Sequence, residues 1–178
     1  MAAQVDLTRV KFIDESGANL AMTRLYARAP RGERVVGSVP RNYGRNVTLI
    51  ATLSLTGITA TMTVDGATDG DVSRTYVHDV LAPTLRPGDL AVLDNLGAHK
   101  VSGSCEAIEQ CGATLLYLPP YSPDFDPIEL CWSKIKTALR AAQARTREAL
   151  EEAITQALAP VTASDALAWF RHCGYALR

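Results

Sequence analysis

Two short apolar runs in the middle of the chain, with a helical stretch between them, constrain the fold more than any other feature. The runs cover residues 89–94 and 114–118, and each has the length of one buried strand. Ser102 or Ser104 is expected to begin a helix between them, and Gly112 to end it. Strands joined through a helix pair in parallel, by a right-handed crossover. The sequence therefore predicts a parallel β–α–β unit.

The residues before this unit predict antiparallel strands, and those after it predict helices. Residues 9–14 are an apolar run that Glu15 and the residues after it should break, and 20–27 are a weaker strand candidate. The β-branched segments 46–54 and 58–64 predict a hairpin. Helices are expected over residues 72–85, 128–142, 146–159 and 164–173. We therefore expect an α/β fold, in which three antiparallel strands are followed by parallel strands in one mixed sheet with helices on both faces.

Length and charge place the chain among ordinary globular domains. A chain of 178 residues suits one domain, which we assign to residues 1–178, and 47% apolar and 21% charged residues argue against disorder. The net charge of −1 gives no overall indication of nucleic-acid binding. However, residues 24–45 hold six arginines and residues 65–94 hold six aspartates. This distribution is expected of a protein that binds phosphate at one place and metal at another, and two solvated surfaces explain it equally well.

The cysteines and the N-terminus predict a protein of the cytoplasm. The four cysteines form no C-x-x-C pair, which is typical of small buried side chains or free thiols in a reducing compartment. The first residues lack a basic segment followed by an apolar one, and no run approaches the length of a membrane span. We expect no membrane partner.

Three carboxylates are candidates for a metal site. Asp14 and Asp94 each end an apolar run, and functional side chains gather at the carboxyl ends of strands in open α/β sheets. Glu129 follows Pro127 in the first turn of an expected helix, and 34 residues separate it from Asp94. Taken singly, each acid is also explained as a turn or helix-capping residue.

Three motifs together carry a family resemblance. They are Phe12-Ile13-Asp14-Glu15-Ser16, Val92-Leu93-Asp94-Asn95 followed by His99, and Leu118-Pro119-Pro120-Tyr121-Ser122-Pro123 leading to Pro127-Ile128-Glu129 and Trp132. With this order and spacing the chain resembles bacterial DDE transposases of the mariner superfamily, within it the insertion-sequence family numbered six-thirty. The resemblance extends from about Val10 to the helices after Lys136.

The resemblance implies a ribonuclease-H-like fold and a catalytic triad of Asp14, Asp94 and Glu129 that holds two Mg²⁺ ions, with Mn²⁺ as a substitute. Carboxylate oxygens suit these hard cations, and a pair of ions can activate a nucleophile and stabilise a leaving oxygen. The implied activity is DNA strand cleavage at transposon ends and strand transfer into target DNA, at TA dinucleotides. Double-stranded DNA is the implied partner, and the enzyme is expected to associate with the nucleoid when it is active.

The chain departs from this family in two respects. Relatives carry asparagine before the proline of the third motif, where this chain has Asp126. That acid either alters metal affinity or only caps the helix. Relatives also have an N-terminal helix-turn-helix region, whereas here the first expected strand lies close to Met1. We therefore expect the catalytic half alone, acting as a homodimer or with a separate helix-turn-helix chain.

Five basic residues are weaker candidates for DNA contacts. Arg41 and Arg45 lie in a glycine-containing segment with an aromatic residue, as in DNA-binding loops, and a plain solvated loop is an equally good explanation. His99 and Lys100 follow Asp94 and are placed to meet a scissile phosphate, although His99 is more simply a surface residue. Lys136 faces either DNA or water.

Three rival hypotheses remain. The first is a ribonuclease-H-like nuclease that hydrolyses DNA without strand transfer. The second is an inactive transposase relic that binds DNA or partner chains, although all three acids are present. The third, a phosphatase with an aspartate nucleophile, is remote because the run at Asp14 lacks a second aspartate two residues later.

Overall fold

The computed structural model describes residues 5–94, 103–120 and 122–176, and within them a single mixed sheet forms the centre of the molecule. Its five strands run in the order β3-β2-β1-β4-β5. Their bounds are β1 Val10–Ala18, β2 Val47–Ser54, β3 Gly57–Asp65, β4 Leu90–Leu93 and β5 Thr114–Tyr117. Strands β1, β2 and β3 pair antiparallel, whereas β4 pairs in parallel with both β1 and β5. The predicted mixed sheet and its hairpin are confirmed.

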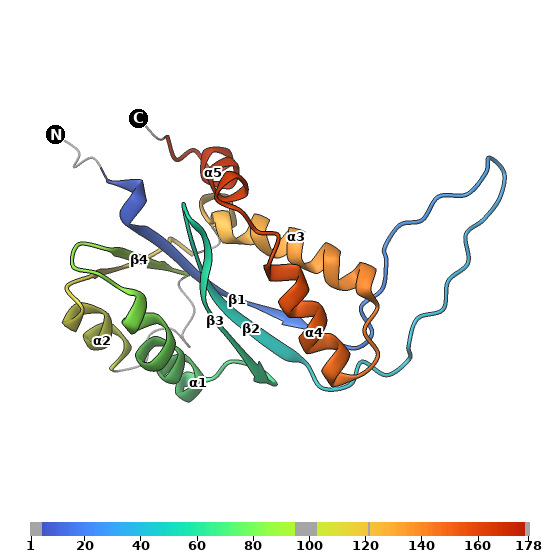
Figure 1. Ribbon diagram of the computed structural model, residues 1–178, viewed down its shortest axis with the longest axis horizontal. Helices are drawn as coiled ribbons and strands as arrows, with labels where there is room; N and C mark the ends of the chain where they lie inside the picture. The colour runs from blue at the N-terminus through green and yellow to red at the C-terminus, as the bar shows by residue number, and fades with distance from the viewer. Residues whose placement is uncertain (1–4, 95–102, 121, 177–178) are drawn as a thin grey trace.

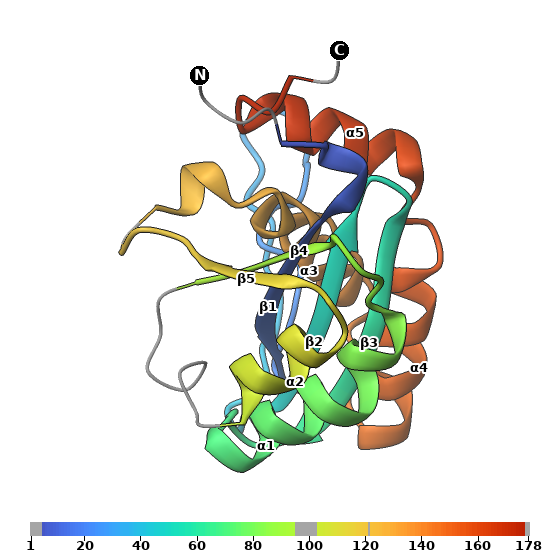
Figure 2. The same ribbon diagram turned by 90° about the vertical axis from the view of Figure 1, so that its left-hand side faces the viewer.

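Helices cover both faces of this sheet (Figures 1 and 2). One face carries α1, a π-helical turn and α2, and the other carries α3, α4 and α5. The helices are α1 Gly70–Thr75, the π turn Tyr76–Leu81, α2 Ser104–Gln110, α3 Pro127–Ala142, α4 Arg147–Leu158 and α5 Ala163–His172. Short 3₁₀ helices occupy Leu7–Arg9, Ala82–Thr84 and Pro123–Phe125. Among the described residues, no helix is long and apolar enough to cross a membrane.

Two apolar cores sandwich the sheet, and side-chain alternation along β1 serves both. Phe12 belongs to the core beneath α3, α4 and α5, whereas Ile13 belongs to the core beneath α1 and α2. Successive side chains of a strand point to opposite faces, so the even-numbered residues of β1 face α3. All eight residues of β2 are buried. Each large buried side chain contributes about 2 kcal/mol, so the sheet is fixed from both sides.

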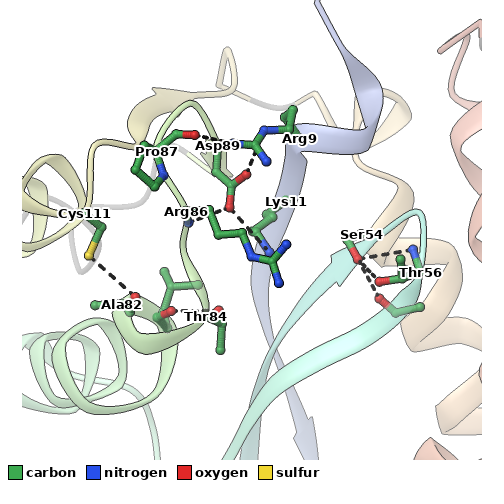
Figure 3. Close-up of polar contacts among 12 residues, drawn as sticks. Arg9, Lys11, Ser54, Thr56, Ala82, Thr84, Arg86, Pro87, Asp89 and Cys111 are labelled. Atoms are coloured by element: carbon green, nitrogen blue, oxygen red, sulfur yellow. Dashed lines mark hydrogen bonds and ion pairs between the residues drawn. The ribbon is translucent and has the colours of Figure 1, made fainter.

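A buried carboxylate at the start of β4 sets the register of the parallel strands (Figure 3). Asp89 is 4% exposed and lies 3.3 Å from Nε of Arg9 and 3.7 Å from Nζ of Lys11. It also accepts a hydrogen bond of 2.9 Å from the backbone N–H of Arg86, while Arg9 donates to the carbonyl of Pro87. These contacts hold the first residues of β1 and β4 side by side.

Two predictions about strands in the first 27 residues are wrong. The strand does not end at Asp14, because β1 continues to Ala18 with residues 15–18 paired to β2. The candidate strand at 20–27 is absent, and the described backbone of residues 20–46 is irregular. Beside β1, β2 pairs with residues 12–18 and β4 with residues 10–13, and no strand pairs with the segment. It extends far from the body as a long excursion (Figure 1).

The predicted helices are present, with changes at three of them. Helix α2 begins at Ser104, but its N-cap is Gly103 instead of a serine. The expected helix over 72–85 begins earlier, capped by Asp69, and becomes π-helical after Thr75. The last helix is capped by Thr162 instead of starting at Ser164. Thr162 Oγ1 accepts from the N–H of Asp165, whose carboxylate accepts from the N–H of Thr162, in a reciprocal capping box.

The Asp89 contacts predict a loss of stability when its charge is removed. Asp89→Asn leaves Arg9 and Lys11 without their shared buried negative charge, and we expect the free energy of unfolding to fall by roughly 2 kcal/mol. The measurement is urea unfolding at neutral pH. Asp71→Asn is the control, because Asp71 is 88% exposed in its pair with Arg74 and such pairs contribute little. Equal stability of the two variants would contradict this role of Asp89.

Candidate active site

Asp14 lies in the middle of β1 and points into the core beneath α3. It is 9% exposed, and its Oδ2 accepts a hydrogen bond of 2.8 Å from Nε1 of Trp132 on α3. The pKa of Asp14 is raised to about 8, chiefly by burial and also by the nearby charges of Asp126 and Glu15. Hydrogen bonds from the Glu15 backbone and from Trp132 act in the opposite direction and lower it. A charged Asp14 is therefore strongly disfavoured in the metal-free protein.

Asp94 directly follows β4, at the level of Asp14. The parallel register pairs Phe12 with Val92 and Ile13 with Leu93, so Asp94 comes next, beside Asp14. Phe12 and Val92 share one core, and Ile13 and Leu93 share the other. By the same alternation Asp94 belongs to the α3 face. The two strands that carry these acids are thus parallel neighbours in the sheet.

Glu129 occupies the first turn of α3 and is exposed. Three residues later on the same helix, Trp132 contacts Asp14. A spacing of three residues is about one helical turn, so α3 carries Glu129 one turn from that contact. Glu129 also lines a surface pocket with Pro123, Asp124, Leu130, His172 and Cys173.

Asp126 is a fourth acid in the same place, and it caps α3. Its carboxylate accepts from the N–H of Ile128 at 3.3 Å, and the residue is 5% exposed. The pKa of Asp126 is raised to about 7, chiefly by burial and also by the charges of Glu129 and Asp94. Asp126 thus lies within electrostatic reach of Asp14, Asp94 and Glu129. The capping alternative for this residue is confirmed.

The donor set suits a hard divalent cation. The described residues contain no group of three His, Cys, Asp or Glu side chains placed to hold one ion. The acids nevertheless crowd together at one place, and their mutual repulsion would be relieved by a cation. Carboxylate oxygens are the ligands that Mg²⁺ and Mn²⁺ prefer. By their chemistry Asp14, Asp94 and Glu129 fit such an ion.

The candidate DNA contacts are dispersed. Arg41 and Arg45 are exposed on the irregular excursion between β1 and β2. The base of that excursion is anchored by Arg145, which donates to the carbonyls of Leu20 and Met22. Lys136 is half-buried on α3.

Two further basic candidates, His99 and Lys100, lie outside the described residues. Lys134 lies two residues before Lys136 on the same helix and does not face solvent freely. It instead joins α3 to α5 through Asp165, at 2.7 Å, and through the carbonyl of Pro160.

Sequence reasoning missed two contacts that support the acids. Trp132 belongs to the third motif and is buried in the core, with 2% exposure, but its hydrogen bond to Asp14 was not predicted. Tyr175 donates from its hydroxyl to the carbonyl of Phe125, 2.7 Å away, just before the α3 cap, and its ring packs on Phe12 and Phe170. A tryptophan three residues after a candidate glutamate, on the apolar face of the helix, was a usable signal for the first. No sequence pattern marked the second.

The sheet and its acids define a class: an α/β domain with carboxylates gathered where β1, β4 and α3 meet. Residues 9–151 match the family model described as DDE superfamily endonuclease, and the chain belongs to that family. No curated protein sequence matches the chain significantly.

Solved structures of the Mos1 mariner transposase share the fold. The paired-end complex with Mg has a TM-score of 0.69 at 16% identity, over 96% of this chain and 53% of that one. The strand transfer complex gives 0.67 at 14% identity, over 94% and 51%. The isolated catalytic domain gives 0.66 at 13% identity, over 94% and 76%. The chain thus spans about half the length of the transposase in the first two complexes. The expected ribonuclease-H-like architecture is confirmed by this likeness to the Mos1 catalytic domain.

The buried position of Asp126 predicts a pH-dependent stability. Its folded-state pKa of about 7 exceeds the ordinary 3.8, so the folded protein retains the proton longer than the unfolded chain, and stability falls as pH rises between these values. Asparagine keeps the cap without the charge. In chelator we expect Asp126→Asn to match the wild type near pH 4 and to exceed its unfolding free energy by roughly 2 kcal/mol at pH 8.

Chemical unfolding at both pH values measures this difference. Asp124→Asn is the matched control, because Asp124 is exposed in the same loop and its substitution should change little at either pH. A difference between Asp126→Asn and the wild type that is equal at the two pH values would contradict the assignment.

Proposed function

We propose that this chain is the catalytic domain of a DNA transposase, which cleaves DNA strands at transposon ends and transfers them into target DNA. The observation that carries the proposal is the meeting of Asp14, Asp94 and the Glu129-bearing helix in a chain of the DDE endonuclease family. The similar structures include a strand transfer complex and a paired-end complex with a transposon end, which supports DNA as the substrate class.

In this proposal Asp14, Asp94 and Glu129 would hold two divalent cations. When bound, Mg²⁺ lowers the pKa of the nucleophile and neutralises charge on the leaving oxygen. Similar structures were determined with Mg and with Mn, which supports the use of either ion. Asp126 caps α3 and so sets the direction in which Glu129 leaves the helix.

The reaction has two displacements at phosphorus. Water first attacks a phosphodiester at the transposon end, the bond to the 3′ oxygen breaks, and that oxygen takes a proton to become a 3′-hydroxyl. The 3′-hydroxyl then loses its proton and attacks a target phosphodiester, forming a new P–O bond and releasing a target 3′-hydroxyl. The proposed target is the TA dinucleotide. The burial of Asp14 beneath Trp132 keeps one side of the site closed to water.

DNA binding is assigned in this proposal to basic side chains around the acids and on the excursion between β1 and β2. Arg41 and Arg45 are the described candidates on the excursion, Lys136 is the candidate on α3, and His99 and Lys100 follow Asp94. Side chains that meet phosphates position DNA without reading its sequence. The selection of transposon ends is assigned to a partner.

For end selection we propose a separate helix-turn-helix chain, and the protein partner of this domain is that chain or a second copy of the domain. The support is the excursion itself, which presents large apolar side chains to solvent. Its most exposed members are Leu25, Tyr26, Val36, Val39 and Tyr43, between 60% and 89% exposed. Exposed apolar groups of this kind mark interaction sites on soluble proteins.

Substitution of the acids tests the catalytic assignment. Asp14→Asn, Asp94→Asn and Glu129→Gln should each lower Mg²⁺-dependent cleavage of transposon-end DNA by roughly 1,000-fold or more, because each removes one charged ligand. DNA binding, followed by fluorescence anisotropy in chelator, should stay within a few-fold of wild type. Glu148→Gln on α4 is the control. Retained cleavage in any one variant would remove that residue from the triad.

Pre-cut transposon ends distinguish transposase from nuclease with the same proteins. The wild type should join their 3′-hydroxyl ends to a plasmid, and the three variants should not. Hydrolysis of transposon-end DNA without any joining of pre-cut ends would favour the nuclease hypothesis and contradict the proposal.

The arginines of the excursion predict a salt-dependent effect. Arg41→Ala with Arg45→Ala should weaken binding to all DNA sequences alike and reduce the slope of log affinity against log salt by about 2, near one unit for each lost phosphate contact. Titrations at several salt concentrations measure the slope. Arg171→Ala, on α5, is the control for loss of positive charge. A slope equal to that of the wild type would exclude both arginines from the DNA interface.

A further inference from the structure

A hydrogen bond between buried side chains links the two elements that carry the candidate acids. Nε1 of Trp132 donates to Oδ2 of Asp14 at 2.8 Å, and the two residues are 2% and 9% exposed. The indole N–H is a donor only, so it engages one carboxylate oxygen and leaves Oδ1 of Asp14 outside this contact. The bond therefore holds Oδ2 of Asp14 on the side of α3.

Packing holds the indole in that position. Trp132 lies in the core that also contains Ile128, Ile135 and Phe12, each 2% exposed or less. A close-packed side chain cannot swing away without opening a cavity, so the N–H points constantly at Asp14. Because Trp132 sits three residues after Glu129, the same bond also fixes the first turns of α3 against β1.

A purely structural role would need only an acceptor for a buried N–H. A neutral acceptor would serve that role without the cost of burying a carboxylate. The acceptor here is instead an acid that would hold metal in the proposed function.

We propose that Trp132 is a positioning residue, whose indole N–H orients the Asp14 carboxylate so that Oδ1 is presented to a divalent cation. The inference rests on the proposed function, because it takes Asp14 as a metal ligand. Outer-shell hydrogen bonds of this kind change metal affinity by about 10- to 100-fold when removed.

The test is the affinity of the DNA-free protein for Mn²⁺, measured by calorimetry. Trp132→Phe keeps an aromatic ring and removes the N–H, and its dissociation constant for Mn²⁺ should rise about 10-fold or more. Cleavage by this variant should recover to within a few-fold of wild type at saturating Mn²⁺. Trp169→Phe is the control, because Trp169 packs against the same core. An affinity of Trp132→Phe equal to that of Trp169→Phe would overturn the inference.

An isosteric replacement separates the hydrogen bond from the loss of volume. Site-specific incorporation of 3-benzothienylalanine at position 132 keeps the shape of the bicyclic ring and puts sulfur where the N–H was. It should weaken Mn²⁺ binding as Trp132→Phe does, with a melting temperature closer to that of wild type. Wild-type affinity in this protein would overturn the inference, whether or not Trp132→Phe folds.

Asp14→Asn distinguishes failure of this inference from failure of the proposed function. If Asp14→Asn retains both Mn²⁺ binding and cleavage, Asp14 is not a ligand, and the proposed site and the role of Trp132 are both wrong. If Asp14→Asn loses both while the two Trp132 replacements keep wild-type affinity, the site stands and only the positioning role is wrong.

Fluorescence gives a second readout without DNA. The chain has two tryptophans, so Trp169→Phe leaves Trp132 as the only indole. Mn²⁺ bound at Asp14 should quench this indole at the concentration that calorimetry finds, and adding Asp14→Asn should abolish the quenching. Quenching that survives the loss of Asp14 would contradict a metal held beside Trp132.

Discussion

The parallel register of β1 and β4 is the constraint on which the candidate site depends. The register is anchored at its start by Asp89, a buried carboxylate that meets Arg9 and Lys11 (Figure 3). A slip of one residue would turn every side chain of β4 to the opposite face. With the register fixed, Asp94 follows β4 beside Asp14 on the face that α3 covers. An ion pair remote from the acids thus determines whether they meet.

Concentrated negative charge is the second physical theme. Asp14 and Asp126 are both buried, and burial raises the pKa of each far above its ordinary value, with neighbouring acids raising it further. Such crowding destabilises a metal-free fold above the ordinary pKa of aspartate. It persists here on a sheet packed on both faces, with Trp132 and the α3 cap holding the acids in place. In a domain that binds divalent cations, the free energy of metal binding offsets the repulsion between these acids. A purely structural domain would have no such compensation.

Much of the fold was predictable because it follows from local patterns. Alternating β-branched residues predicted β2 and β3, and the apolar runs ending in acids predicted β4 and the start of β1. The spatial proximity of Asp14 and Asp94 followed from the parallel crossover, which is a rule of chain topology. Their catalytic roles and that of Glu129 stay predictions, as do the DNA contacts of Arg41 and Arg45.

What the sequence did not predict depends on tertiary contacts. The last residues of β1 are strand because β2 supplies partners there, although Gly17 has little intrinsic preference for a strand. The segment 20–27 has the apolar residues of a strand but pairs with no strand of the sheet, and its backbone is irregular. Trp132 looked like an ordinary core residue, because periodicity reports burial and says nothing of which acceptor an indole N–H finds. The Tyr175 hydroxyl likewise reaches across 50 residues to Phe125, a separation that no local pattern encodes.

The central claim is that Asp14, Asp94 and Glu129 together hold divalent metal. Crystals of the protein soaked in Mn²⁺ test it most directly, because anomalous scattering at the manganese edge locates the ion without assuming a ligand. We expect manganese between the Asp14 and Asp94 carboxylates, with Glu129 completing the site. Manganese bound only elsewhere, with both aspartates unliganded at saturating metal, would contradict it.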